Sequence, residues 1–117
     1  MTFRTLALST VAALAISASP AAAPGDEARV VEITARRFQF TPGEITLQRG
    51  EPVVLRLHSE DVTHGFYMKA LGIDATIEPD KITNVVVRPE AAGRYTVICD
   101  HFCGSGHGGM KLTIVVE

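Results

Sequence analysis

The sequence predicts an all-β fold, a sandwich or small barrel of about seven to eight strands. Short runs in which apolar and polar residues alternate recur between residues 29 and 116, and turn residues separate them. No segment shows the apolar period of an α-helix. Regularly spaced short strands without helices are typical of sandwiches and small barrels, and they give the fold class directly.

The strands expected in the first half of the chain are separated by turns such as Pro42-Gly43. They are residues 29–35 with a continuation through Phe38 and Phe40, residues 44–48, residues 52–58, and an irregular strand over residues 62–68. Every second residue in the first three is apolar, so we expect one face of each strand to lie in the core.

The second half of the chain supplies the remaining strands. They are residues 81–88, residues 93–99 and residues 110–116. Residues 71–76 are compatible with either a strand or a loop. The alternation does not specify which strands pair, because several pairing orders satisfy the same pattern.

Length and composition favour one small domain. The chain has 117 residues, of which 46% are hydrophobic and 21% are charged, enough for a single modest core. The net charge of −2 and the lack of a long Lys/Arg run give no support to a nucleic-acid partner.

Residues 1–24 have the features of a signal peptide. Arg4 gives a positive start, residues 6–16 are mostly apolar, and small residues follow, with cleavage expected near residues 21–25. The apolar stretch is shorter than the ~20 residues of a membrane-spanning helix. We therefore expect export to a periplasm-like compartment, no stable membrane insertion of the mature chain, and one folded domain over residues 25–117.

The residues with the most distinctive chemistry lie between the last two expected strands. Cys99, Cys103, His107 and Met110 follow one another at spacings of four, four and three. Thiolate, imidazole and thioether groups are the soft ligands that select copper. His64, next to a glycine in the irregular strand, is the best candidate for a second imidazole.

Two other uses of the cysteines stay open. In an oxidising compartment, an even number of cysteines forms disulfides by default, so a Cys99–Cys103 disulfide competes with metal binding. Zinc held by two cysteines and two histidines is the other alternative, although it would leave Met110 without a role.

These residues carry a resemblance to a known family. Asp61-Val-Thr-His-Gly-Phe66 together with Cys99-x3-Cys103-Gly-x2-His107-x2-Met110 resembles the CuA copper domain of cytochrome c oxidase subunit II and nitrous oxide reductase. An earlier segment, Phe40-x-Pro42 with Ile45 and Gly50, resembles the opening strands of the wider cupredoxin family. The resemblance spans roughly residues 30–116 and implies a cupredoxin-like Greek-key β-sandwich.

The resemblance also implies a binuclear site with two copper ions. Cys99 and Cys103 would each bridge both ions, while His64 and His107 would each complete one. Met110 would be a weak axial ligand of one ion. The full set of metal residues implied is His64, Cys99, His101, Cys103, His107 and Met110.

Residue 101 takes part in this set through its main-chain carbonyl, which would be the axial ligand of the second ion. The family often has Glu or Gln at this position, whereas this chain has His101. The extra imidazole would tune the site, bind solvent or offer an alternative ligand.

A site whose positions are filled by protein ligands has little room for substrate. The expected function is therefore that of a soluble exported electron-transfer protein with a redox partner protein, and not an enzyme. The alternative is a copper chaperone or storage protein that delivers copper to another protein's site. The sequence keeps this alternative open because it shows no transmembrane hairpin and contains no tryptophan.

Overall fold

The structure is a computed structural model that describes residue 2, residues 10–15 and residues 28–117. Residues 10–15 form neither helix nor strand. The expected cleavage region near residues 21–25 lies outside the described residues. Within the described part of the chain, no helix has the length and apolar character needed to cross a membrane.

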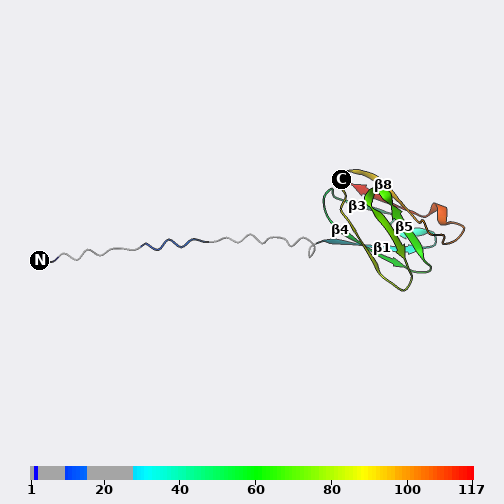
Figure 1. Cartoon of the computed structure of the whole chain (residues 1–117), viewed down its shortest axis with the longest axis horizontal. Helices are drawn as coiled ribbons and strands as arrows, with labels where there is room; N and C mark the ends of the chain where they lie inside the picture. Colours follow the sequence, from blue (N-terminus) through cyan, green and yellow to red (C-terminus); the bar gives the residue numbers. More distant parts are fainter. Residues whose placement is uncertain (1, 3–9, 16–27) are drawn as a thin grey trace.

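Nine strands and two short 3-10 helices are present in the described residues (Figure 1). The strands are β1 Arg29–Arg36, β2 Gln39–Thr41, β3 Glu44–Leu47, β4 Val53–Ser59, β5 His64–Met68, β6 Ile73–Ile77, β7 Thr83–Val87, β8 Gly93–Ile98 and β9 Lys111–Val116. The 3-10 helices are η1 Lys69–Leu71 and η2 His107–Gly109. The predicted all-β fold is confirmed.

Two segments explain why the structure has nine strands and not about seven to eight. A turn at residues 37–38 divides the first expected strand into β1 and β2, which pair as an antiparallel hairpin. The ambiguous segment over residues 71–76 contains the end of η1 and most of β6. Gly72 lies between these two elements with a φ of 67°, a left-handed conformation that glycine adopts without steric cost.

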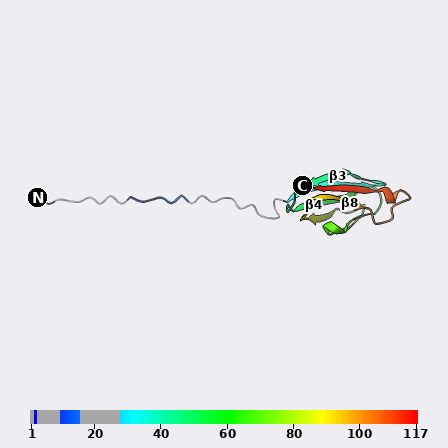
Figure 2. The same cartoon turned by 90° about the horizontal axis from the view of Figure 1, so that it is seen from above.

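The strands form two sheets that pack face to face (Figures 1 and 2). One sheet has the order β2-β1-β4-β7 and the other the order β3-β9-β8-β5-β6. The pairs β1–β4 and β3–β9 are parallel, whereas the remaining pairs are antiparallel. This mixed order joins strands far apart in the sequence, which alternation alone could not have specified.

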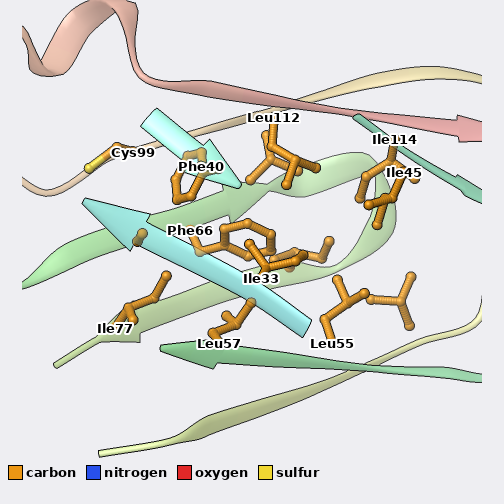
Figure 3. Close-up of a cluster of buried hydrophobic side chains, with 14 of the residues drawn as sticks. Ile33, Phe40, Ile45, Leu55, Leu57, Phe66, Ile77, Cys99, Leu112 and Ile114 are labelled. Carbon is orange, nitrogen blue, oxygen red and sulfur yellow. The ribbon is translucent and has the colours of Figure 1, made fainter. Parts of the chain in front are cut away.

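The inward-facing residues of both sheets fill one core. Leu55 and Leu57 of β4 and Leu112 of β9 are fully buried, as their alternation with polar residues predicted. Phe66 of β5 is also fully buried, and its ring meets that of Phe40 edge-on with centroids 5.3 Å apart (Figure 3). Aromatic pairs in this arrangement add to the stabilisation that burial alone provides.

The loop between β8 and β9 lies at the end of the sandwich opposite the C-terminus (Figure 1). Figure 3 shows Cys99 at the edge of the apolar core, with its sulfur directed away from the central side chains. The stretch that contains the candidate ligands is therefore a loop held at both ends by rigid strands, a common setting for a binding site.

Replacing Phe66 tests the importance of the aromatic pair in the core. Phe66→Ala should lower the free energy of unfolding by about 3–5 kcal/mol, because it leaves a cavity and removes the contact with Phe40. Phe66→Leu should cost less, since it keeps most of the apolar volume. Denaturant unfolding of the metal-free protein measures both losses, and equal losses for the two variants would contradict the expectation.

Candidate metal centre

Three buried donor side chains meet at one end of the core. His64 begins β5, Cys99 directly follows β8, and Cys103 lies in the loop before η2. Their exposed fractions are 0%, 3% and 5%, respectively. The imidazole nitrogen and the two sulfurs that could bind a metal all lie within 4.8 Å of one another. Such a cluster of soft donors has the spacing that a thiophilic metal ion requires.

The cysteines are free thiols in this structure, and their Sγ atoms lie 3.8 Å apart. A disulfide requires a separation of about 2 Å between the sulfurs. The structure therefore holds Cys99 and Cys103 as two separate potential ligands and not as the disulfide alternative.

The backbone of β5 approaches the residues after β8 closely, and this approach brings the donors together. The main-chain nitrogen of Gly65 donates to Cys99 Sγ over 3.3 Å. A Cβ atom at residue 65 would lie 2.0 Å from Asp100 Oδ1 and 2.7 Å from His101 N. Only glycine permits this approach, which explains the glycine directly after His64.

The Asp61 carboxylate fixes the orientation of the His64 ring. Asp61 Oδ1 lies 2.7 Å from His64 Nε2, and His64 Nδ1 lies 4.0 Å from Cys99 Sγ. A carboxylate partner favours the imidazole tautomer with the proton on Nε2. The lone pair of Nδ1 is then on the side of Cys99 Sγ and free to bind a metal.

Asp61 is itself held by main-chain donors. Arg37 N donates to Asp61 Oδ2 over 2.8 Å, and Val62 N donates to Oδ1 over 2.6 Å. Partial burial opposes ionisation of this carboxyl, but the hydrogen bonds from Arg37, His64 and Val62 outweigh it and lower the pKa of Asp61 to about 2. Asp61 is therefore a carboxylate at neutral pH and a constant partner for His64.

At Cys103 the effect of burial is not outweighed by other interactions. Desolvation, together with the hydrogen bond and charge of neighbouring Cys99, raises the pKa of Cys103 to about 11. In the metal-free protein Cys103 is therefore a neutral thiol at physiological pH. A metal ion that binds its sulfur must displace that proton, so metal affinity should rise with pH.

The remaining expected ligands are Met110, His101 and His107, which are not among the three clustered donors described above. Met110 is 1% exposed, and its main-chain oxygen accepts a hydrogen bond from Cys99 N over 3.3 Å. The His101 imidazole is exposed, but the main-chain oxygen of that residue lies 3.2 Å from Cys99 Sγ. His107 belongs to η2, and its side chain lies outside what the structure describes.

Arg37 is a residue that sequence reasoning did not assign to the site. Its Nε donates to the main-chain oxygen of Cys103 over 2.8 Å. It also borders a shallow cleft of about 210 Å³ that opens over Cys103 beside His101 and Phe102. A basic residue in a short turn has no signature in sequence, because many surface turns carry one.

Comparison with known proteins places the fold in a family. Residues 6–116 match the sequence profile of the cupredoxin-like domain. The chain belongs to the cupredoxin-like domain family. Cytochrome c oxidase subunit 2 of Thermus thermophilus is 33% identical over 93 residues, which cover 80% of this chain and 69% of that protein.

Other relatives of this cupredoxin-like chain are longer. A second cytochrome c oxidase subunit 2 from Thermus thermophilus is also 33% identical, and the chain spans about half of its length, 55%. The nitrous-oxide reductase of Cupriavidus necator is 30% identical over 91 residues, which cover 74% of this chain and 14% of that enzyme.

Solved structures support the same fold. A heme-copper terminal oxidase dimer contains a chain with a TM-score of 0.70 and 28% identity, covering 80% of this chain and 67% of that one. The periplasmic domain of cytochrome oxidase subunit II of Bradyrhizobium japonicum has a TM-score of 0.71 and 16% identity, covering 76% and 83%. Auracyanin A, a "blue" copper protein of Chloroflexus aurantiacus, has a TM-score of 0.61 and 16% identity, covering 75% and 98%. The predicted cupredoxin-like sandwich is confirmed.

The lowered pKa of Asp61 predicts an acid-dependent stability difference. Because the folded-state pKa lies below the ordinary value of 3.8, at about 2, the stabilisation is present above the ordinary value and is lost as pH falls through the folded one. Asp61→Asn should therefore be less stable than the parent by about 1–2 kcal/mol at neutral pH. Unfolding of both metal-free proteins against pH should show the difference vanishing near the folded pKa; a difference independent of pH would contradict this account.

Proposed function

We propose that this cupredoxin-like domain holds copper in a binuclear site and acts in electron transfer. The observation that carries the proposal is the convergence of the His64 imidazole with the sulfurs of Cys99 and Cys103 inside the protein. Imidazole with two thiolates is a donor set that favours copper over hard cations such as Mg²⁺.

The chemistry of the donors fits copper. All three side chains are buried, so a cation there is desolvated, and two thiolate charges offset much of the resulting cost. The Nε2 atom of His64 is already held by Asp61, which leaves the other ring nitrogen for the metal. Carboxylate support of this kind fixes a histidine ligand and strengthens its donor atom.

The proposed ligand set is wider than this cluster. It comprises His64, Cys99, Cys103, His107, Met110 and the main-chain carbonyl of His101. Met110 and the His101 carbonyl are supported by the burial of the former and by the short distance from the latter to Cys99 Sγ. Copper bound at these residues would supply a one-electron redox centre.

The chain contributes rigidity and exclusion of water. Cys99 follows β8 directly and Met110 precedes β9, two strands that pair along their whole length. Ligands on rigid strands move little when the charge at the centre changes, which favours rapid electron transfer. Burial of the donors leaves little space for substrate, in keeping with a role as carrier and not as catalyst.

The relatives support the same proposal. Cytochrome c oxidase subunit 2 and nitrous-oxide reductase are redox proteins by name, and the similar domain of Bradyrhizobium japonicum is periplasmic. We accordingly propose an exported domain over residues 25–117 in a periplasm-like compartment, with residues 1–24 as its signal peptide. Its partner would be a redox protein.

Copper delivery to another protein is the second candidate. The cleft over Cys103 favours it, because the cleft brings solvent and a potential acceptor close to one thiol ligand. Under this alternative, the domain would surrender its copper to the acceptor and would not retain it through repeated oxidation and reduction.

Copper reconstitution tests the binuclear site. The protein should take up about two copper ions per chain and show the visible and electron paramagnetic resonance spectra of one electron shared between two coppers. Cys103→Ser should abolish that spectrum, whereas Met110→Leu should keep it and mainly shift the reduction potential. A hyperfine pattern from a single copper ion in the parent protein would rule out the binuclear assignment.

The exposed ring of Phe102 is the expected contact with the redox partner. Phe102 is 74% exposed and lies between His101 and Cys103 at the cleft. Phe102→Ala should slow electron exchange with a small c-type cytochrome about tenfold by removing apolar contact area, without changing the reduction potential. Stopped-flow kinetics measure the exchange, and Val86→Ala, which removes a 70% exposed side chain from β7, is the matched control.

Mixtures of the copper-loaded protein with the cytochrome also distinguish electron transfer from copper delivery. After exchange, gel filtration and metal analysis should find the copper still bound to this chain. Transfer of copper to an added metal-free acceptor protein, without sustained electron exchange, would instead support delivery.

A further inference from the structure

The turn between β1 and β2 reaches both segments that carry the buried donors. Arg37 N donates to Asp61 Oδ2, and Arg37 Nε donates to the main-chain oxygen of Cys103, each over 2.8 Å. Asp61 in turn holds His64. One residue of this turn therefore links the histidine support to the cysteine loop, although the two lie far apart in the sequence.

Phe38, the second residue of the turn, packs on the same loop. A Cβ atom added at Gly104 would lie 2.8 Å from the Phe38 ring, and one added at Gly106 would lie 2.7 Å from it. Any side chain at either position would displace the ring. The ring therefore rests on the bare main chain directly after Cys103, and Gly104 also has a φ of +142° that disfavours other residues.

The guanidinium of Arg37 also acts on the donors through its charge. Its Nε lies 2.8 Å from the main-chain oxygen of Cys103, so the positive charge lies beside the residue that carries this donor. A fixed positive charge favours the state of a nearby centre that carries less positive charge. For a metal at Cys103, that state is the reduced one.

We propose that the Arg37–Phe38 turn is a positioning device for the metal centre. It holds the Cys103 loop against the His64 segment before metal binds, and the Arg37 charge raises the reduction potential of the bound metal. This inference rests on the copper site proposed above and deepens it by naming residues that tune the centre without touching the metal.

The contacts distinguish this role from that of an ordinary hairpin turn. A two-residue turn needs no hydrogen bond to a distant loop. Arg37 nevertheless donates both of these hydrogen bonds to residues outside β1 and β2, namely Asp61 and Cys103. Each of them ends at a ligand residue or at the group that orients one. Outer partners of this kind typically change metal affinity about 10- to 100-fold when removed.

Three arginine variants separate charge from geometry. Arg37→Met keeps the length of the side chain but removes both its charge and its hydrogen bond to Cys103, whereas Arg37→Lys keeps the charge alone. Arg94→Met is the control, because Arg94 is an exposed arginine at the start of β8 that pairs with Glu44. Removing its charge alters the net charge of the chain without touching the centre.

Copper retention and potential are the first readouts. Arg37→Met should lose copper to a chelator about 10- to 100-fold faster than the parent and should show a lower reduction potential. Arg37→Lys should lose copper faster but keep a potential close to that of the parent. Arg94→Met should match the parent in both. Parent-like copper loss and potential in Arg37→Met would overturn the proposal.

Amide hydrogen exchange of the metal-free proteins is the second readout. Arg37→Met and Phe38→Ala should speed exchange over residues 101–106 several-fold, and Phe38→Leu should do so less. Unchanged exchange there would overturn the positioning role even if copper binds. If the parent protein fails to bind copper, the proposed function fails, while the exchange result still decides whether the turn holds the loop.

Discussion

A fully buried histidine requires a partner for each of its two ring nitrogens, and much of the centre is organised by this requirement. His64 has one partner in Asp61, while its other nitrogen faces Cys99. An unpaired polar group in an apolar interior costs about 1–3 kcal/mol. Asp61 accepts the proton of Nε2, and Nδ1 is left to accept a thiol hydrogen or to bind a metal ion. The hydrogen bonds that keep Asp61 ionised are as much a part of the centre as the sulfurs.

The sandwich provides this arrangement by placing β5 beside β8. Tyr67 of β5 pairs with Ile98 of β8, so the segment that begins at His64 runs alongside the residues that follow β8. Gly65 lets the two backbones approach closely, and its amide donates to Cys99 Sγ. The parallel pairs β1–β4 and β3–β9, together with the loop between β8 and β9, complete the scaffold of the centre. The donors are thus positioned by main-chain geometry without a bound metal.

Sequence alone predicted the parts of this molecule that depend on local pattern. Alternation identified the inward faces of β4 and β9, because burial of one strand face demands it. Ligand types and spacing pointed to Cys99 and Cys103. The links made by Arg37 and the division into β1 and β2 escaped prediction, since they depend on contacts between distant segments. The segment that became β6 stayed ambiguous for the same reason: only pairing with β5 determines it.

Cys99, Cys103 and Met110 belong to the same buried cluster as the leucines and isoleucines of the sandwich. A ligand that binds only the folded state adds its binding free energy to the stability of the fold. Binding of the proposed copper would therefore link metal occupancy to the survival of this domain. A chain that has never acquired the proposed copper would open more often and be cleaved sooner by proteases than a chain that holds it. The number of intact molecules would then depend on how much metal the compartment had supplied to the protein.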